Sequence, residues 1–295
     1  MWSTFKRKFI GDRDFYGYVL RLAVPMIIQN AITSFVSFLD NIMVGQIGTE
    51  QMSGVAIVNQ LMFVFNICIF GAVSGAGIFG TQYFGKGDYE GQKYAYRFKV
   101  YSAALITVLA ALLFVFGGEF LISLYLSDTG SVGDITLALK YGQEYLAIMV
   151  IGLFPFALSQ TYISSVRECG ETFVPMVAGL VAVFTNLVLD VILIFGLLGF
   201  PVLGVRGAAI ATVIARFVEC VIVIVWTHKN TVKNKFIIGA YKSLYIPKNI
   251  CFAILKKGTP LMLNEMFWAS GMAVITQCYA VRGLEVVAAQ NISST

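Results

Sequence analysis

The feature that most constrains this chain is a series of long apolar segments, each long enough to cross a bilayer as a helix of about 20 residues. We predict spans at 22–44, 55–80, 100–126, 141–163, 174–198, 205–227 and 259–281, with an eighth beginning near 285. Backbone inside a bilayer must be satisfied within helices or within a closed barrel. The apolar runs are continuous and do not alternate with a period of two, which selects helices. Because only 13% of the 295 residues are charged, the sequence predicts an all-α polytopic membrane protein.

Lysine and arginine residues are distributed unequally between the two ends of these spans. Seventeen of the 21 lie in the N-terminal segment or after the second, fourth and sixth spans, and Lys99 is among those assigned to the loop after the second span. Positive residues favour the cytoplasmic side, so we expect a cytoplasmic N-terminus and a cytoplasmic loop at 228–258 in an inner or plasma membrane. This basic loop could also touch anionic lipid, although topology alone accounts for its charge. The net charge of +5 therefore needs no nucleic-acid partner.

An internal repeat indicates how the spans are grouped. A shift of 235 residues places Pro25 on Pro260 and Gln29 on Asn264, and it also aligns a Gly and a Glu beyond the first helix of each copy. A parallel repeat of six spans is a known transporter plan, while chance similarity between apolar helices is the alternative. We therefore predict an N-terminal segment at 1–21, a six-helix lobe at 22–227, the loop at 228–258 and the start of a second lobe at 259–295.

Two acidic residues lie within predicted spans, where an ionised side chain costs about 2.5–3.5 kcal/mol at the bilayer centre. Asp40 follows Pro25 by 15 residues, and Asp190 follows Pro175 by 15 residues. Both acids thus lie about 22 Å along helices that run in the same direction. We expect them at one level in the outward-facing half of the bundle.

Two further polar residues are expected in the same layer. Asn186 precedes Asp190 by one helical turn, and Thr212 lies near the outer end of the sixth span. Carboxylate, amide and hydroxyl oxygens are ligands for a hard cation such as Na⁺, and two close carboxylates could instead carry a proton. The alternative is a buried polar network that only joins helices.

Other candidate residues carry weaker signals. Glu265 lies five residues after Pro260, so it either lines a cavity or marks a helix end. Arg216 could offset the two acids, but Glu219 three residues later is the slightly favoured partner. Four glycines of the second span predict close helix packing: Gly71, Gly75, Gly77 and Gly80. The five cysteines form no CxxC motif, so we interpret them as packing residues and expect no cofactor beyond a coupling ion.

Four stretches together resemble the multidrug and toxic compound extrusion (MATE) transporters. They are RLAVPMIIQNAITSFVSFLDNIMVGQIGTEQMSGVAIVNQ, GTQYFGKGDYEG, SSVRECGETFVPM and NLVLDVILIFGLLGFPVLGVRGAAIATVIAR. The resemblance implies a twelve-helix antiporter that exports amphipathic, often cationic, compounds in exchange for Na⁺ or H⁺. It implies a cation site at the four residues Asp40, Asn186, Asp190 and Thr212, a helix bend at Pro25, and similarity of Glu265 to an acid of the seventh helix.

Members of that family are longer than this chain, so we expect an incomplete gene or a fragment that lacks most of the second lobe. Three alternatives to a drug antiporter follow: a lipid-linked oligosaccharide or polysaccharide flippase, an intramembrane aspartyl enzyme, and a non-functional truncated product. A flippase would favour several basic residues within the membrane, and only Arg216 qualifies. The enzyme is disfavoured because the GxGD signature is absent, and no Walker motif suggests ATP hydrolysis.

Overall fold

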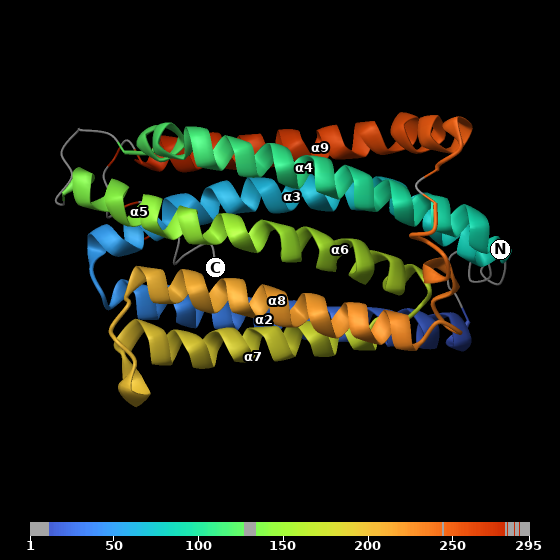
Figure 1. Ribbon diagram of the computed structural model, residues 1–295, viewed down its shortest axis with the longest axis horizontal. Coiled ribbons are helices and arrows are strands. Elements are labelled where there is room, and N and C mark those ends of the chain that lie inside the picture. Colours follow the sequence, from blue (N-terminus) through green and yellow to red (C-terminus); the bar gives the residue numbers. More distant parts are fainter. Residues whose placement is uncertain are drawn as a thin grey trace, which may run out of the picture.

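The computed structural model describes residues 12–126, 134–243 and 245–280, together with 282, 286 and 289. Its helices form an elongated bundle (Figure 1). They are α2 (Arg13–Gly45), α3 (Thr49–Lys86), α4 (Tyr89–Ser123), α5 (Ile135–Met149), α6 (Leu153–Glu168), α7 (Phe173–Phe195), α8 (Val205–Lys229) and α9 (Lys248–Ala280), with short 3₁₀ turns η1 (Val150–Gly152), η2 (Leu197–Gly199) and η3 (Lys235–Ile237). No strand occurs among the described residues, and the predicted all-α fold is confirmed.

Local sequence signals define where several helices begin and end. The side chain of Asp12 accepts a hydrogen bond from the Phe15 amide at 2.8 Å, and Asp88 accepts one from the Gly91 amide at 2.9 Å. Such N-caps satisfy amides that the first helical turn leaves unpaired. α3 ends at Gly87, whose φ of 73° is left-handed and therefore favours glycine.

Six helical segments of the described chain are long and apolar enough to cross a membrane. They coincide with the first six predicted spans, and α5, η1 and α6 together form the fourth. The seventh predicted span lies within α9. This helix is less apolar because it contains polar residues such as Asn264, Glu265 and Gln277. α9 already begins at Lys248, inside the segment predicted as a loop. The eighth predicted span lies outside the described residues, apart from 286 and 289.

α3 occupies the centre of the bundle, because α4, α5, α6 and α9 all pack against it. Its side chains Ile57, Val58 and Ile69 are at most 1% exposed. By contrast, α4 turns Val115 and Phe116 outward, with 64% and 85% exposure. Large apolar side chains facing outward on a helix that is buried on its other face are typical of contact with lipid.

The glycines of α3 allow close approach of two neighbouring helices, as predicted. A Cβ added at Gly75 would lie 2.7 Å from the Cα of Gly258 in α9. At Gly77 the added atom would lie 2.9 Å from a carboxylate oxygen of Glu168 in α6. One face of α3 therefore packs on α9, and the adjoining face packs on α6.

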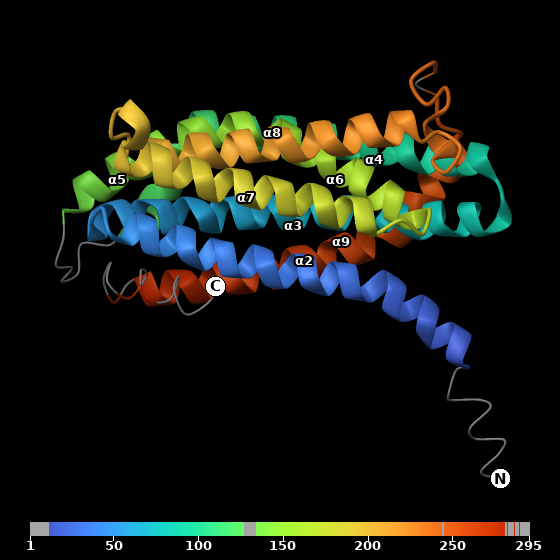
Figure 2. The same cartoon turned by 90° about the horizontal axis from the view of Figure 1, so that it is seen from below.

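α2 is the least buried of the candidate spans. It packs mainly on α7, and Figure 2 shows it curving away from the bundle toward its N-terminal end. Pro25 lies in this helix twelve residues after its first residue, as Pro260 does in α9. Gln29 and Asn264, a second aligned pair of the predicted repeat, also lie at matching positions in α2 and α9, whereas the pairs Gly48 with Gly283 and Glu50 with Glu285 involve residues outside the described chain.

Most of the described lysines and arginines gather at one end of the bundle, here called the basic end, where α3, α6 and α8 finish. The segment between α8 and α9 is docked there, because Arg97 of α4 donates hydrogen bonds to the carbonyls of Ala240 (2.8 Å) and Tyr245 (2.9 Å). The hydroxyl of Tyr241 also bonds to those of Tyr96 and Tyr162. The docked segment fixes where α9 starts against α3.

Candidate functional site

A cavity of about 590 Å³ lies in the half of the bundle away from the basic end. Side chains from α2, α3, α5, α7, α8 and α9 line it. Its polar lining includes Asp40, Asn59, Asn186, Thr212 and Arg216. Three of the four residues predicted to share a layer therefore line one cavity, and Asp190 lies next to them.

The two acids approach each other from α2 and α7. Asp40 lines the cavity, and its Oδ1 is buried without a hydrogen-bond partner among the described residues. Asp190 is 0% exposed, and neither of its carboxylate oxygens has a hydrogen-bond partner in the described chain. The two carboxylates repel each other electrostatically, and the side chain of Asn186 lies beside Asp190, where its amide attracts that carboxylate without a hydrogen bond of normal geometry. Buried carboxylate oxygens without donors are costly, so this pair can accept a cation or a proton.

Asn186 and Thr212 connect α7 to α8 beside the acids. The Nδ2 of Asn186 lies 3.5 Å from the hydroxyl of Thr212, which donates to the carbonyl of Ala208 at 3.0 Å. The Thr212 hydroxyl therefore donates its proton to a carbonyl of its own helix. Its oxygen can still accept a contact from the cavity. Amide and hydroxyl oxygens thus lie beside the two carboxylates. Oxygen atoms of these kinds are the ligands that coordinate Na⁺.

Tyr145 of α5 belongs to this site and was not predicted. Its side chain is 2% exposed, and its hydroxyl donates to Oδ1 of Asn59 at 3.4 Å. It also interacts electrostatically with Asp40 and Asp190. An aromatic residue in an apolar span usually indicates core packing, so the sequence held no signal for this role.

Arg216 supplies a positive charge at the edge of the cavity. Its guanidinium donates to the carbonyl of Gly152 at 3.3 Å and lies 5.1 Å from the ring centre of Phe156. The slightly favoured partner Glu219 attracts it electrostatically, but the two make no direct ion pair in the described structure. The carbonyl and the ring hold the guanidinium instead, and it interacts electrostatically with Tyr145 of the same cavity.

The other two predicted residues lie away from the cavity. Glu265 is half-buried in α9, one turn before Trp268, where the lining of the cavity begins on that helix. Trp268 packs on Phe63 with ring centres 5.7 Å apart. Pro25 lies within α2, toward the basic end. Glu265 is thus not brought to Asp40 and Asp190 in this arrangement.

A second polar cluster occupies the basic-end half, and here one prediction was wrong. Lys99, assigned from the sequence to a loop, lies inside α4 and is fully buried. Its ammonium pairs with Glu168 and donates to the hydroxyls of Ser164 (3.1 Å) and Ser165 (3.0 Å). These three contacts offset the cost of burying the charge, which is why a lysine is stable at this depth.

A cavity of about 540 Å³ adjoins this cluster between α2, α3 and α6. Glu168 and Arg167 line it, and Arg167 donates to Oε1 of Gln29 across the cavity at 3.1 Å. The bundle therefore has a cavity with unpaired acids in one half and a cavity with a paired acid and an arginine in the other.

Comparison with known proteins now identifies the family. The family model named MatE matches residues 25–192, which include Asp40, Asn186 and Asp190. The chain belongs to the MatE family. This matched range covers more than half of the chain, from the proline of α2 almost to the end of α7.

MatE relatives match nearly the whole chain. It is 29% identical over 282 residues to the probable multidrug resistance protein NorM of Thermotoga maritima, covering 93% of this chain and 57% of that protein. It is 27% identical over 258 residues to the NorM protein of Bacillus licheniformis, covering 87% and 55%. The chain thus spans about half the length of the curated relatives it matches.

A solved MatE structure has the same fold. The inward-facing conformation of a multidrug resistance MATE family transporter of the MOP superfamily matches with a TM-score of 0.74 and 22% identity. The match covers 93% of this chain and 60% of that one. The helices of this chain are therefore arranged in the fold of that transporter.

Proposed function

We propose that this chain is the cation-binding part of a secondary antiporter that exports amphipathic or cationic compounds in exchange for Na⁺ or H⁺. The observation that carries the proposal is the carboxylate of Asp190, which is wholly buried, makes no hydrogen bond of normal geometry to any described residue, and faces the charge of Asp40. A bound Na⁺ or proton would supply the missing partner. No cofactor beyond this ion is proposed.

The donor set supports a coupling ion in this cavity. Asp40 and Asp190 would provide the charge, while Asn186 and Thr212 would provide neutral oxygens. Transport follows if the ion and the exported compound prefer different arrangements of the protein, since each then displaces the other. The curated relatives are named as multidrug resistance proteins, so we propose transport of small molecules and not catalysis.

We further propose that the basic end faces the cytoplasm of a cell membrane. Positive residues favour that side, and it would place the unpaired acids in the outward half. The flippase alternative is less well supported, because the arginine of the outer cavity, Arg216, is engaged by Gly152 and Phe156. A lipid-linked phosphate would need a freer positive lining.

Direct cation binding tests the proposal without requiring a second lobe. The purified chain is melted in detergent with NaCl or with choline chloride at equal ionic strength, across a range of pH. We expect Na⁺ at a hundred times its Kd to add about 2.7 kcal/mol of stability, or acid to do so if protons bind. Asp40→Asn should abolish this gain, whereas Glu90→Gln, at an exposed ion pair with Lys93, should keep it.

Drug export is then measured in cells that produce the chain. Retention of a fluorescent cationic drug should fall when the chain is produced, and Asp40→Asn should restore retention to the level of empty cells. Cation binding without export would separate an intact ion site from a complete transporter. Neither Na⁺ nor acid stabilisation in the parent chain, or an undiminished gain in Asp40→Asn, would remove the proposed site.

A further inference from the structure

Glu219 of α8 is a half-buried acid that the proposed ion site does not use. It lies one helical turn after Arg216, toward the basic end. α6 packs along α8, and the last turn of α6 carries Arg167. Glu219 attracts both guanidiniums electrostatically, yet it forms no direct ion pair with either in the described structure. One acid is therefore shared by an arginine from each cavity.

The two arginines are held by neutral groups, which leave their charges in place. Arg216 donates to the carbonyl of Gly152 at 3.3 Å, and Arg167 donates to the side-chain oxygen of Gln29 at 3.1 Å. Glu168, the residue next to Arg167, is already paired with Lys99. Glu219 is thus the acid that offsets both arginines, and it can neutralise only one of them.

The surplus positive charge reaches the ion site through Tyr145. This side chain interacts electrostatically with Arg216 and with both acids of the site. Arg216 and Asp40 also line the same cavity. The interacting charges therefore form a single group, here called the charge network, whose members are Asp40, Asp190, Arg216, Glu219 and Arg167.

The charge network contains three acids and two arginines. When all five are ionised it has one surplus negative charge, and the neighbouring pair of Lys99 and Glu168 adds none. Unbalanced charge is costly in a protein interior or a membrane. Two carboxylates alone would also suit a divalent cation such as Ca²⁺. With the arginines included, a divalent cation or a second monovalent one would leave the network positive.

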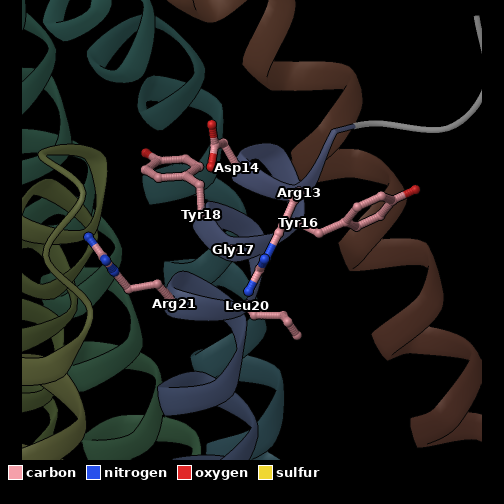
Figure 3. Close-up of a pocket in the computed structure, with 7 residues that line it drawn as sticks. All are labelled: Arg13, Asp14, Tyr16, Gly17, Tyr18, Leu20 and Arg21. Atoms are coloured by element: carbon pink, nitrogen blue, oxygen red, sulfur yellow. The ribbon is translucent and has the colours of Figure 1, made fainter. Parts of the chain in front are cut away.

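Charges at the first turns of α2 are not subject to this balance. Arg13, Asp14 and Arg21 line a hollow of about 510 Å³ there, and Figure 3 shows their side chains extending from the helix. All three are exposed, so water can solvate each charge separately. The balance therefore concerns the interior network and not the charges at the surface.

We propose that the charge network takes up one monovalent cation, and that Glu219 strengthens and Arg216 weakens its binding although neither supplies a ligand. The inference rests on the proposed ion site and adds its stoichiometry and its selectivity for a single charge. Na⁺ and a proton both satisfy it, because each carries one positive charge.

Equilibrium dialysis of the purified chain with radioactive Na⁺ tests this inference. The parent chain should hold one Na⁺ at saturation, and Ca²⁺ should not compete. A unit charge about 10 Å away changes cation affinity roughly tenfold at the effective dielectric of a protein interior. Glu219→Gln should therefore weaken Na⁺ binding about tenfold, and Arg216→Gln should tighten it by a similar factor. If protons bind instead, the midpoint of stabilisation by acid should move about one pH unit down in Glu219→Gln and up in Arg216→Gln.

Two control variants separate charge balance from structural damage. Glu219→Asp keeps the charge and should retain the affinity of the parent chain. Lys99→Met combined with Glu168→Gln removes one charge of each sign from the neighbouring pair, so it should leave cation affinity unchanged. Melting curves in choline chloride verify that every variant folds.

The possible contradictions differ in what they remove. Two Na⁺ per parent chain, or equal competition by Ca²⁺, would overturn the inference and leave the proposed ion site standing. Shifts of the same sign in Glu219→Gln and Arg216→Gln would overturn it as well, because a purely structural role weakens binding in both. A parent chain that neither Na⁺ nor acid stabilises would remove the ion site and this inference together.

Discussion

The two halves of the bundle bury acidic residues in opposite ways. At the basic end, Glu168 is held by the ammonium of Lys99 and the hydroxyl of Ser164. In the half away from the basic end, Asp190 makes no hydrogen bond of normal geometry in the described chain and faces the charge of Asp40. A membrane helix tolerates either acid only at a cost. The satisfied acid is therefore compatible with the fold as it stands, whereas the unsatisfied acid requires a partner that the described residues do not supply.

The largest expected effect comes from breaking the satisfied pair. Lys99→Met removes the ammonium but keeps the length of the side chain, which leaves Glu168 buried without its counter-charge. We expect a loss of about 3–5 kcal/mol in the free energy of unfolding, measured by titrating the chain with SDS in mixed micelles.

A second substitution distinguishes charge from packing. Adding Glu168→Gln to Lys99→Met should recover most of the loss, because no unpaired charge then remains. Lys93→Met is the matched control, since Lys93 forms an exposed pair with Glu90 one turn earlier on α4, and it should change stability by less than about 1 kcal/mol. Equal losses from Lys93→Met and Lys99→Met would contradict the contrast between the two halves.

A smaller effect, of opposite sign, is expected in the half of the bundle that contains Asp40 and Asp190. Asp190→Asn removes the repulsion from Asp40, so in sodium-free buffer at neutral pH it should stabilise the chain by about 1 kcal/mol. The gain in stability on adding Na⁺ should disappear. Glu168→Gln is the natural comparison, since it leaves Lys99 unpaired and should destabilise by several times that amount. If both substitutions destabilise equally, Asp190 is a structural residue like Glu168.

The common level of Asp40 and Asp190 could be predicted from the sequence because helices rise by a fixed amount per residue. The spacing of Asp40 from Pro25 and of Asp190 from Pro175 gives the depth of each acid. Residue spacing does not give the direction in which each helix faces. Glu265 shows this limit, since a suitable acid on α9 lies one turn short of the cavity that Trp268 lines.

Lys99 and Tyr145 could not be assigned from the sequence for a related reason. Basic residues usually lie at the ends of spans, and the burial of Lys99 depends on Glu168, 69 residues later in the chain. Tyr145 likewise depends on Asn59, 86 residues earlier. Both roles arise from contacts between separate helices, so they appear only when the helices are packed together.

The smallest expected effect in the comparison of the two halves comes from removing the hydroxyl of Tyr145. Tyr145→Phe keeps the ring in its buried position and removes only a donor that reaches Asn59 near both acids. A single hydrogen bond contributes about 0.5–1.5 kcal/mol, so we expect a loss of this size or less in stability and a fewfold weaker response to Na⁺. Tyr162→Phe is the control, since its hydroxyl bonds to Tyr241 at the basic end and should leave the Na⁺ response intact. A hydroxyl that helps to order the ligands cannot be removed without changing their affinity for Na⁺. An unchanged Na⁺ response in Tyr145→Phe would therefore limit the ion site to Asp40 and the residues of α7 and α8.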